Sequence, residues 1–207
     1  MSLAQVLAAF QASASQCDSL IANAHKTDAA GVALLPALDQ RQITVAAFLN
    51  LFMSWETFLE DSLTKLMAGS PTISGRVPVR YVSPPTAEAA RLLVIGVQRY
   101  FDYGNHDNVR RIVHMYFDKG YPFEPHLSAI NTDLCDLRTM RNASAHISST
   151  TQAALESLAQ RVFSTPQPGI DLYSLLMTTD PRSAVGNTVF AESHEKLLVV
   201  AGLVANG

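Results

Sequence analysis

The stretch "DQRQITVAAFLNLFMSWETFLEDSLTKLMA", residues 39–68, decides the fold of this chain. At about 100° per residue its large apolar side chains fall on one stripe, which is typical of an amphipathic helix. A stripe of this length must be buried against other helices, so the stretch predicts one long core helix with Asp39 as its N-cap. The side chains on the stripe are Phe48, Phe52, Trp55, Leu59, Leu63 and Leu66.

The rest of the chain consists of further helix-forming segments, separated by breaks rich in Pro, Gly and Ser. No segment alternates apolar and polar residues as a sheet strand does, apart from a short extended piece over 77–82. A chain of 207 residues fits one domain. We therefore predict an all-α bundle of some seven helices in a single domain over 1–207. The further expected helices cover 2–25, 87–101, 108–118, 127–146, 152–163 and 189–205, and 171–177 is a short separate piece.

Charge is unevenly distributed along the chain. The composition is 48% hydrophobic and 16% charged, with a net charge of −3, which indicates a folded core and no overall affinity for nucleic acid. Counted by segment, residues 76–146 carry +2, between −3 over 1–75 and −2 over 147–207. Eight of the nine cations of the basic segment are arginine, a side chain that binds phosphate bidentately. This segment is a weak indication of a surface that faces phosphate.

The cysteines, histidines and N-terminus exclude several classes of protein. Cys17 and Cys135 are isolated and the histidines lack metal-ligand spacing, so we expect no disulfide framework, no metal site and no cofactor. No Lys or Arg precedes Lys26, which argues against a signal peptide. No apolar run reaches the roughly 18 residues of a membrane span. We expect a cytoplasmic protein without a membrane association.

The stretch "RTMRNASAHISS", residues 138–149, raises a different question. On the helix expected over 127–146, Arg141 falls within the apolar face. An uncompensated buried charge costs several kcal/mol, so this arginine either pairs internally or faces a cleft or a subunit interface. Glu56, on the edge of the apolar stripe of the long helix, is a possible partner.

A second stripe on the same helix carries polar side chains. Arg138, Asn142 and His146 recur at i, i+4 and i+8 and therefore share one face. Two interpretations stay open from the residues alone. Either an Arg141–Glu56 salt bridge links two helices and His146 is favoured by the helix dipole at a C-terminus, or the cluster is a functional site.

The segment "MRNASAH", residues 140–146, resembles the Arg-polar-x-x-x-His signature of the HEPN superfamily, and in particular its RiboL-PSP-HEPN group. These are small all-α bundles of prokaryotic toxins, defence systems and some eukaryotic ribonucleases. The preceding "SWETFLEDSL", residues 54–63, adds to the resemblance, which is clearest over 40–165. Ser144 departs from the pattern, because family members often carry an aliphatic residue there.

The resemblance implies a metal-independent endoribonuclease, as in a toxin or a defence effector. Arg141 and His146 match the two defining catalytic positions and Asn142 the polar one, with Glu56 and Arg138 as supporting residues. A histidine that titrates near neutral pH can move the proton of a 2′-hydroxyl, and an arginine can stabilise charge that develops at phosphorus.

The resemblance also implies partners, which are RNA, a second copy of the chain and, for a toxin, a cognate antitoxin. In the expected homodimer the two motif helices meet near the two-fold axis. Two alternative functions remain. One is a HEPN-like module that binds RNA or a nucleotide without cutting it, and the other is a structural helical partner in which Arg141 and Glu56 hold the core.

Overall fold

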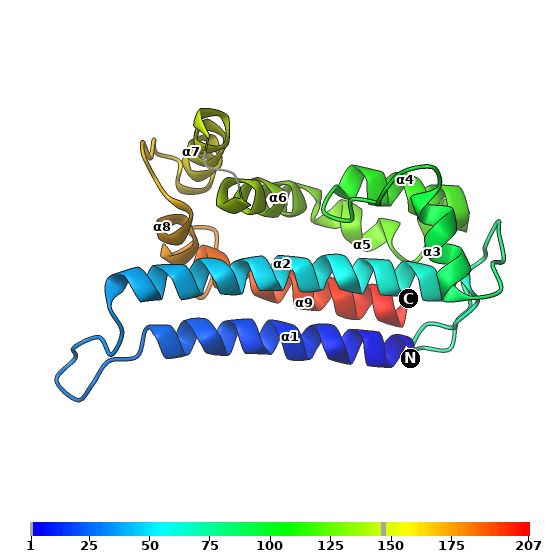
Figure 1. The fold of residues 1–207 in the computed structure, drawn as a ribbon, viewed down its shortest axis with the longest axis horizontal. Coiled ribbons are helices and arrows are strands. Elements are labelled where there is room, and N and C mark those ends of the chain that lie inside the picture. Colours follow the sequence, from blue (N-terminus) through cyan, green and yellow to red (C-terminus); the bar gives the residue numbers. More distant parts are fainter. Residues whose placement is uncertain (1, 146–147) are drawn as a thin grey trace. The chain divides into compact units, whose positions relative to one another are not determined.

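The computed structural model describes residues 2–145 and 148–207, and the regular secondary structure in these ranges is helical (Figure 1). Within them, extended backbone pairs only at the isolated bridges Thr27–Ala33, Arg80–Phe117 and Thr179–Thr188. The predicted all-α fold is therefore confirmed. The helices are α1 (Leu3–Ala24), α2 (Ala37–Met67), α3 (Ala87–Ile95), α4 (His106–Tyr116), the 3-10 turn η1 (Asp118–Gly120), α5 (Glu124–Ala129), α6 (Asn131–Ala145), α7 (Ser149–Phe163), α8 (Leu172–Met177) and α9 (Val189–Asn206).

The chain divides into two compact units. Unit 1 consists of Met1–Ala12, Ser54–Leu134 and Leu197–Gly207, and unit 2 of Ser13–Met53 and Cys135–Lys196. Each unit combines distant segments of the sequence. The single domain expected over residues 1–207 stays a prediction.

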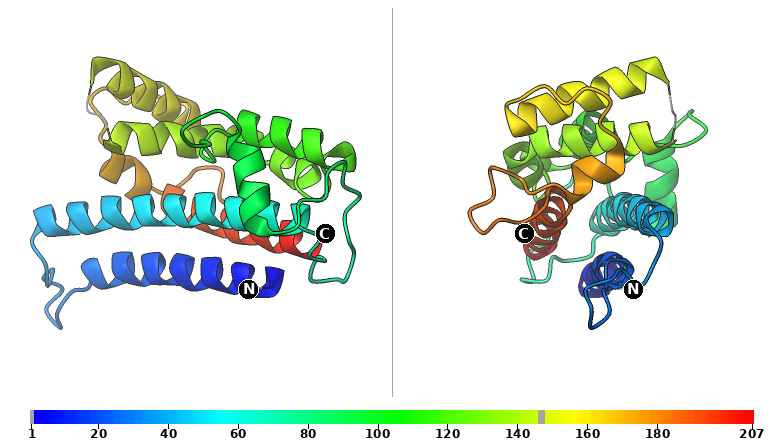
Figure 2. Two further views of the ribbon diagram at one scale, coloured as in Figure 1. Left: turned by 45° about the vertical axis from the view of Figure 1, so that its right-hand side comes forward. Right: turned by 90° about the vertical axis from the view of Figure 1, so that its left-hand side faces the viewer.

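The core of unit 1 forms around the only tryptophan of the chain. The ring of Phe10 on α1 lies 5.9 Å from that of Trp55 and 5.4 Å from that of Phe58, both on α2. Trp55 also reaches α4, where its indole Nε1 donates a hydrogen bond to His106 at 3.1 Å. Within unit 1, Figures 1 and 2 show the start of α1, the later part of α2 and the end of α9 running alongside one another.

Unit 2 is held together around the short helix α8. The ring of Tyr173 on α8 stacks on His25, which follows α1, and its hydroxyl lies 3.2 Å from His25 Nε2. Asp171 caps the first turn of α8 and forms an ion pair with Arg41 of α2. These contacts fix α8 against α1 and α2.

The apolar stripe predicted on the long helix is confirmed, since all six of its side chains are buried. The start of this helix differs from the prediction. Because α2 begins at Ala37, Asp39 lies in its first turn and not at the N-cap. A carboxylate in the first turn is still favoured by the helix dipole.

Two further predicted helices end differently in the structure. The helix expected over 87–101 stops at Ile95, because Gly96 takes a positive φ of 59° and bonds its N–H to Leu92 O. The helix expected over 127–146 is interrupted at Ile130, whose φ of −117° and ψ of 24° separate α5 from α6. The described residues therefore form nine α-helices where the sequence predicted some seven.

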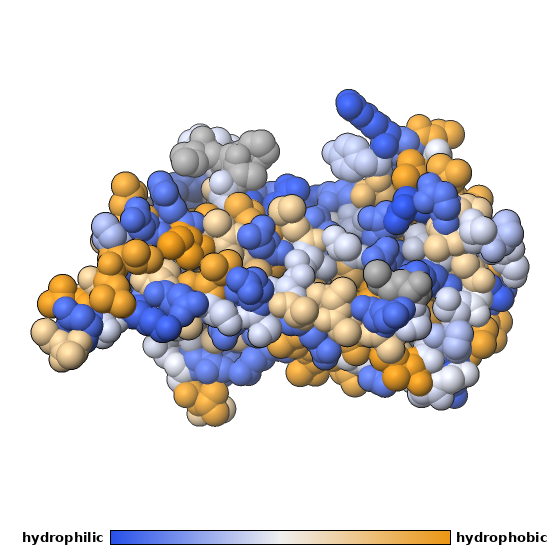
Figure 3. Space-filling model, turned by 60° about the horizontal axis from the view of Figure 1, so that its bottom comes forward, coloured by the Kyte–Doolittle hydropathy of each residue, from blue (hydrophilic) through white to orange (hydrophobic). Residues whose placement is uncertain are grey.

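The surface carries many single hydrophobic side chains. On the face shown in Figure 3, hydrophobic and hydrophilic residues are interspersed. Within the described ranges, none of the helices combines the length and the apolar character that crossing a bilayer requires.

Candidate functional site

The predicted motif lies in the last turns of α6. This helix is anchored by Leu134, Leu137 and Met140, which are buried. On a helical wheel Leu137 and Met140 lie about 40° and 100° to one side of Arg141, whereas the buried face extends only about 20° to its other side, to Leu134. Arg141 therefore sits at the edge of the buried face and not in its middle, and its side chain is only partly buried.

Arg141 makes two local hydrogen bonds. Its Nη1 donates to Oδ1 of Asn142 at 3.3 Å, and its carbonyl accepts from Oγ of Ser144 at 2.6 Å. A guanidinium has five N–H donors, of which Asn142 uses one. Asn142 thus holds one side of the guanidinium in place.

Three other arginines of unit 2 pair with carboxylates, and Arg141 takes no part in these three pairs. They are Arg41–Asp171, Arg161–Asp136 and Arg182–Asp180.

The remaining predicted site residues are only partly brought together. Arg138, Arg141 and Asn142 lie on α6 within unit 2, and each is partly exposed. His146 lies outside the described residues. Glu56 is partly exposed and belongs to unit 1, so its pairing with Arg141 stays a prediction.

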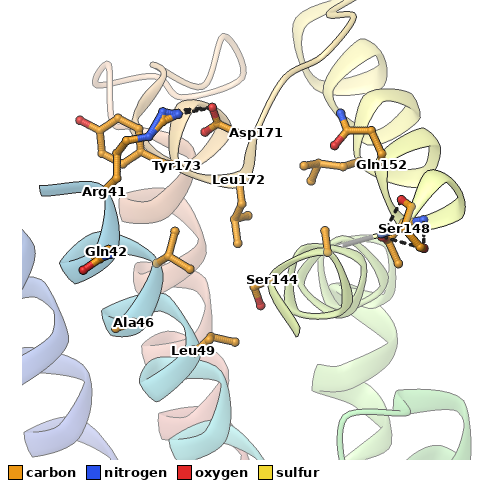
Figure 4. A pocket seen from close by; sticks show the side chains of 14 residues that line it. Arg41, Gln42, Ala46, Leu49, Ser144, Ser148, Gln152, Asp171, Leu172 and Tyr173 are labelled. Atoms are coloured by element: carbon orange, nitrogen blue, oxygen red, sulfur yellow. Dashed lines mark hydrogen bonds and ion pairs between the residues drawn. The ribbon is translucent and has the colours of Figure 1, made fainter. Parts of the chain in front are cut away.

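A pocket that was not among the predictions from sequence lies in unit 2, with a volume of about 520 Å³ (Figure 4). Its size is in the range of small-molecule sites, which are mostly apolar with a few polar groups. Its walls come from α2, the end of α6, the start of α7 and the start of α8. The apolar lining residues are Val45, Ala46, Leu49, Ala143, Leu155 and Leu172, and the polar ones Arg41, Gln42, Ser144, Ser148, Thr151, Gln152, Asp171 and Tyr173.

One rim of the pocket carries a compact charged group. The guanidinium of Arg41 lies 5.1 Å above the ring of Tyr173 and pairs with Asp171 (Figure 4). Partial burial opposes the charge on Asp171, but hydrogen bonds from the Ser174 backbone and from Arg41 lower the pKa of this carboxyl below its usual range. The rim therefore holds a balanced ion pair near neutral pH.

The motif and the pocket adjoin on α6 but face different ways. Ala143 and Ser144 of the motif line the pocket, whereas Arg141 and Asn142 do not. Asn142 lies about 160° around the helix from Ser144, so the polar stripe of the motif turns away from the pocket. The structure thus offers two surfaces, a polar one around Arg141 and a largely apolar pocket.

A sequence signal for the pocket existed on the long helix. Val45 and Leu49 are spaced i and i+4, about 60–100° around the helix from Phe48. They widen the apolar stripe on one side, beyond the part that the core covers. The strip formed by Val45 and Leu49 faces α6, α7 and α8. The sequence pattern of α2 alone does not predict which helices lie opposite this strip.

The described part of the chain contains no group of three His, Cys, Asp or Glu side chains that could hold a metal ion. Since His146 is outside that part, the expected independence from metal stays a prediction.

Comparisons of the chain with protein-family models, with curated proteins and with solved structures find no match. The resemblance to the HEPN superfamily therefore rests on the residues of the motif and of the long helix. The chain is an all-α protein, and its HEPN type stays a prediction.

Proposed function

We propose that this chain is a metal-independent endoribonuclease of the cytoplasm, acting as a toxin or a defence effector. The observation that supports this most is the state of Arg141. Arg141 is partly exposed, its guanidinium donates a hydrogen bond to Asn142, and it takes no part in the three ion pairs of unit 2 named above. An arginine in this state is suited to bind the phosphate of an RNA backbone.

The proposed reaction is an internal transfer at phosphorus. His146 acts as the base and takes the proton of the 2′-hydroxyl, whose oxygen attacks the adjacent phosphorus. The bond from phosphorus to the 5′-oxygen breaks, and an acid protonates that oxygen, leaving a 2′,3′-cyclic phosphate and a 5′-hydroxyl. Arg141 stabilises the charge that develops on the phosphoryl oxygens.

The proposed working unit is a symmetric homodimer. The reaction needs a base and an acid, while the motif supplies one histidine per chain. A two-fold axis near the motif helices would bring two copies of His146 and Arg141 to one cleft. For a toxin, a cognate antitoxin that covers this cleft is the natural further partner.

The direct test is RNA cleavage by the purified protein in the presence of a chelator. We expect the wild type to cut, and the variants Arg141→Ala and His146→Ala to lose activity. Arg99→Ala is the matched control, because it removes an exposed arginine of the same basic segment outside the motif. The proposal fails if the wild type does not cut RNA, or if His146→Ala cuts as well as the wild type.

A second candidate function is favoured by the pocket. A free nucleotide or a single base of RNA fits a cavity of small-molecule size, and the pocket has such a size. Binding of RNA without cleavage, with or without added magnesium, would favour this function over the first.

A further inference from the structure

The Gln152 carboxamide at the pocket is held in one orientation. Its Nε2 donates to Ile170 O at 2.9 Å and to Glu156 Oε1 at 3.0 Å. A backbone carbonyl can only accept a hydrogen bond. Glu156 is also an acceptor, because hydrogen bonds from Gln152 and from the Gly169 backbone lower the pKa of its carboxyl. Both amide hydrogens are thus used, and the group that Gln152 has left to offer is the acceptor Oε1.

A second group at the pocket is restricted in the same way. The hydroxyl of Ser144 uses its single hydrogen to donate to Arg141 O. A ligand in the pocket therefore meets Ser144 as an acceptor too. Figure 4 shows Gln152 on α7 and Ser144 on α6 on one side of the pocket, opposite Ala46 and Leu49 of α2.

Aliphatic side chains form much of the remaining wall, beside the polar rim at Arg41, Asp171 and Tyr173. Leu49 and Leu172 extend toward the space between α2 and α6 (Figure 4), and Leu155 of α7 is a further lining residue. Aliphatic side chains favour a flat or apolar body, while the two acceptors require hydrogen-bond donors at its edge.

We propose that this pocket binds a flat heterocycle with an exocyclic amino group, namely the adenine or cytosine base of a nucleotide. The amino group donates to Gln152 Oε1 or to Ser144 Oγ, and the ring lies against the leucines. The choice of a nucleobase among amino-bearing rings rests on the proposed function, since RNA supplies such rings. The base can come from an RNA strand or from a free nucleotide, and the chemistry of recognition is the same.

The first test compares ligands that differ in a single group. Adenosine has an exocyclic amino group where inosine has a carbonyl. Cytidine and uridine differ in the same way. In calorimetric titrations we expect adenosine or cytidine to bind at least about tenfold more tightly than its carbonyl counterpart, because a carbonyl would face the two acceptors. Equal affinity within both pairs, or no binding of any of the four at millimolar concentration, overturns the proposal.

The second test fills the pocket. Ala46 lines the pocket and is exposed, so Ala46→Trp adds a large side chain there without disturbing the core. Asn50→Trp is the matched control, since Asn50 is an exposed residue of the same helix outside the pocket lining. We expect Ala46→Trp to abolish nucleoside binding and Asn50→Trp to preserve it. Undiminished binding by Ala46→Trp also overturns the proposal.

The source of the base is decided by a third comparison, of a mononucleotide with a short single-stranded RNA of the same base. Tighter binding of the RNA assigns the pocket to a strand, and equal or tighter binding of the mononucleotide assigns it to a free nucleotide. The outcome is separable from the proposed function. RNA cleavage without nucleoside binding removes the pocket proposal alone, and nucleoside binding without cleavage removes the ribonuclease alone.

Discussion

The indole Nε1 of Trp55 donates a hydrogen bond to Nε2 of His106 at 3.1 Å, and both side chains are buried. An indole N–H can only donate, so Nε2 of this histidine carries no proton in the folded state. His106 is therefore a packing residue at the start of α4, and it illustrates why scattered histidines in a sequence are poor indicators of a site.

We expect Trp55→Phe to lower the free energy of unfolding by about 1–3 kcal/mol, from the lost hydrogen bond and the smaller ring. Urea denaturation followed by circular dichroism measures this. Tyr100→Phe, at a side chain that is 69% exposed, is the control and should change the value by less than about 0.5 kcal/mol. Similar values for the two variants would contradict the structural role of the pair.

Glu124 should make the stability of the fold depend on pH. The guanidinium of Arg110 donates to Oε1 of Glu124 at 2.6 Å and to Oε2 at 3.0 Å. These hydrogen bonds lower the pKa of Glu124 below its usual value of 4.5. A lowered folded-state pKa means that the carboxylate stabilises the fold above about pH 4.5, and that this contribution is lost as the pH falls through the folded pKa.

The variant Glu124→Gln should therefore lose about 1–3 kcal/mol near pH 7, while its difference from the wild type should shrink below about pH 4. Urea denaturation at the two pH values provides the measurement. Glu88→Gln is the control. The side chain of Glu88 is 66% exposed, so its ion pair with Arg91 contributes little to the free energy of unfolding. A difference between Glu124→Gln and the wild type that is the same at both pH values would refute the assignment.

The parts of the fold that sequence predicts well depend on local chemistry. The apolar side chains of α2 recur with the period of a helix and form one stripe. A long helix must bury such a stripe, so its place in the core follows from the sequence. Two helix caps are equally local, since Thr86 accepts from Ala89 N and Ser148 accepts from Thr151 N. In each case the residues that make the contact are three or four positions apart.

The parts that sequence did not predict depend on distant residues. The break at Ile130 falls between residues 126 and 141, where the chain has no Gly or Pro, so neither of the usual helix breakers marks it. The pocket requires α2 to face the end of α6 and the start of α8, which are about 100 or more positions away. The partial burial of Arg141 follows from the same arrangement, because it depends on which side of α6 is covered.

The predicted pairing of Glu56 with Arg141 can be measured by a double-mutant cycle. The two residues belong to different units of the fold. If they pair, Glu56→Gln and Arg141→Gln should show a coupling of at least about 1 kcal/mol in the free energy of unfolding. Glu60→Gln with Arg141→Gln is the control cycle, since Glu60 hydrogen-bonds to Arg91. A coupling no larger than that of the control would reject the pair.

RNA cleavage should require the 2′-hydroxyl at the cut site, because that group is the proposed nucleophile. A single deoxyribose at the cut position should block cleavage there and leave other sites unaffected. Mass spectrometry of the products should find 2′,3′-cyclic phosphate ends. Cleavage at the deoxyribose position, or products that carry a 5′-phosphate, would point to attack by water and not by the 2′-hydroxyl.

Assembly should be visible in the activity of mixed subunits. Equal amounts of wild type and His146→Ala are mixed and allowed to exchange subunits. If one cleft uses His146 from both copies, only the quarter of the dimers that holds two wild-type chains is active. The mixture should then keep about one quarter of the activity of the same total amount of wild-type protein. Independent sites would keep about one half, since each wild-type chain would work alone. A mixture of wild type with Arg99→Ala controls for exchange and should keep full activity.

Sedimentation should show about twice the chain mass of 22.4 kDa for the wild type and for His146→Ala. Activity that falls in proportion to the wild-type fraction, or a monomer at micromolar concentration, would show that each chain carries a complete site.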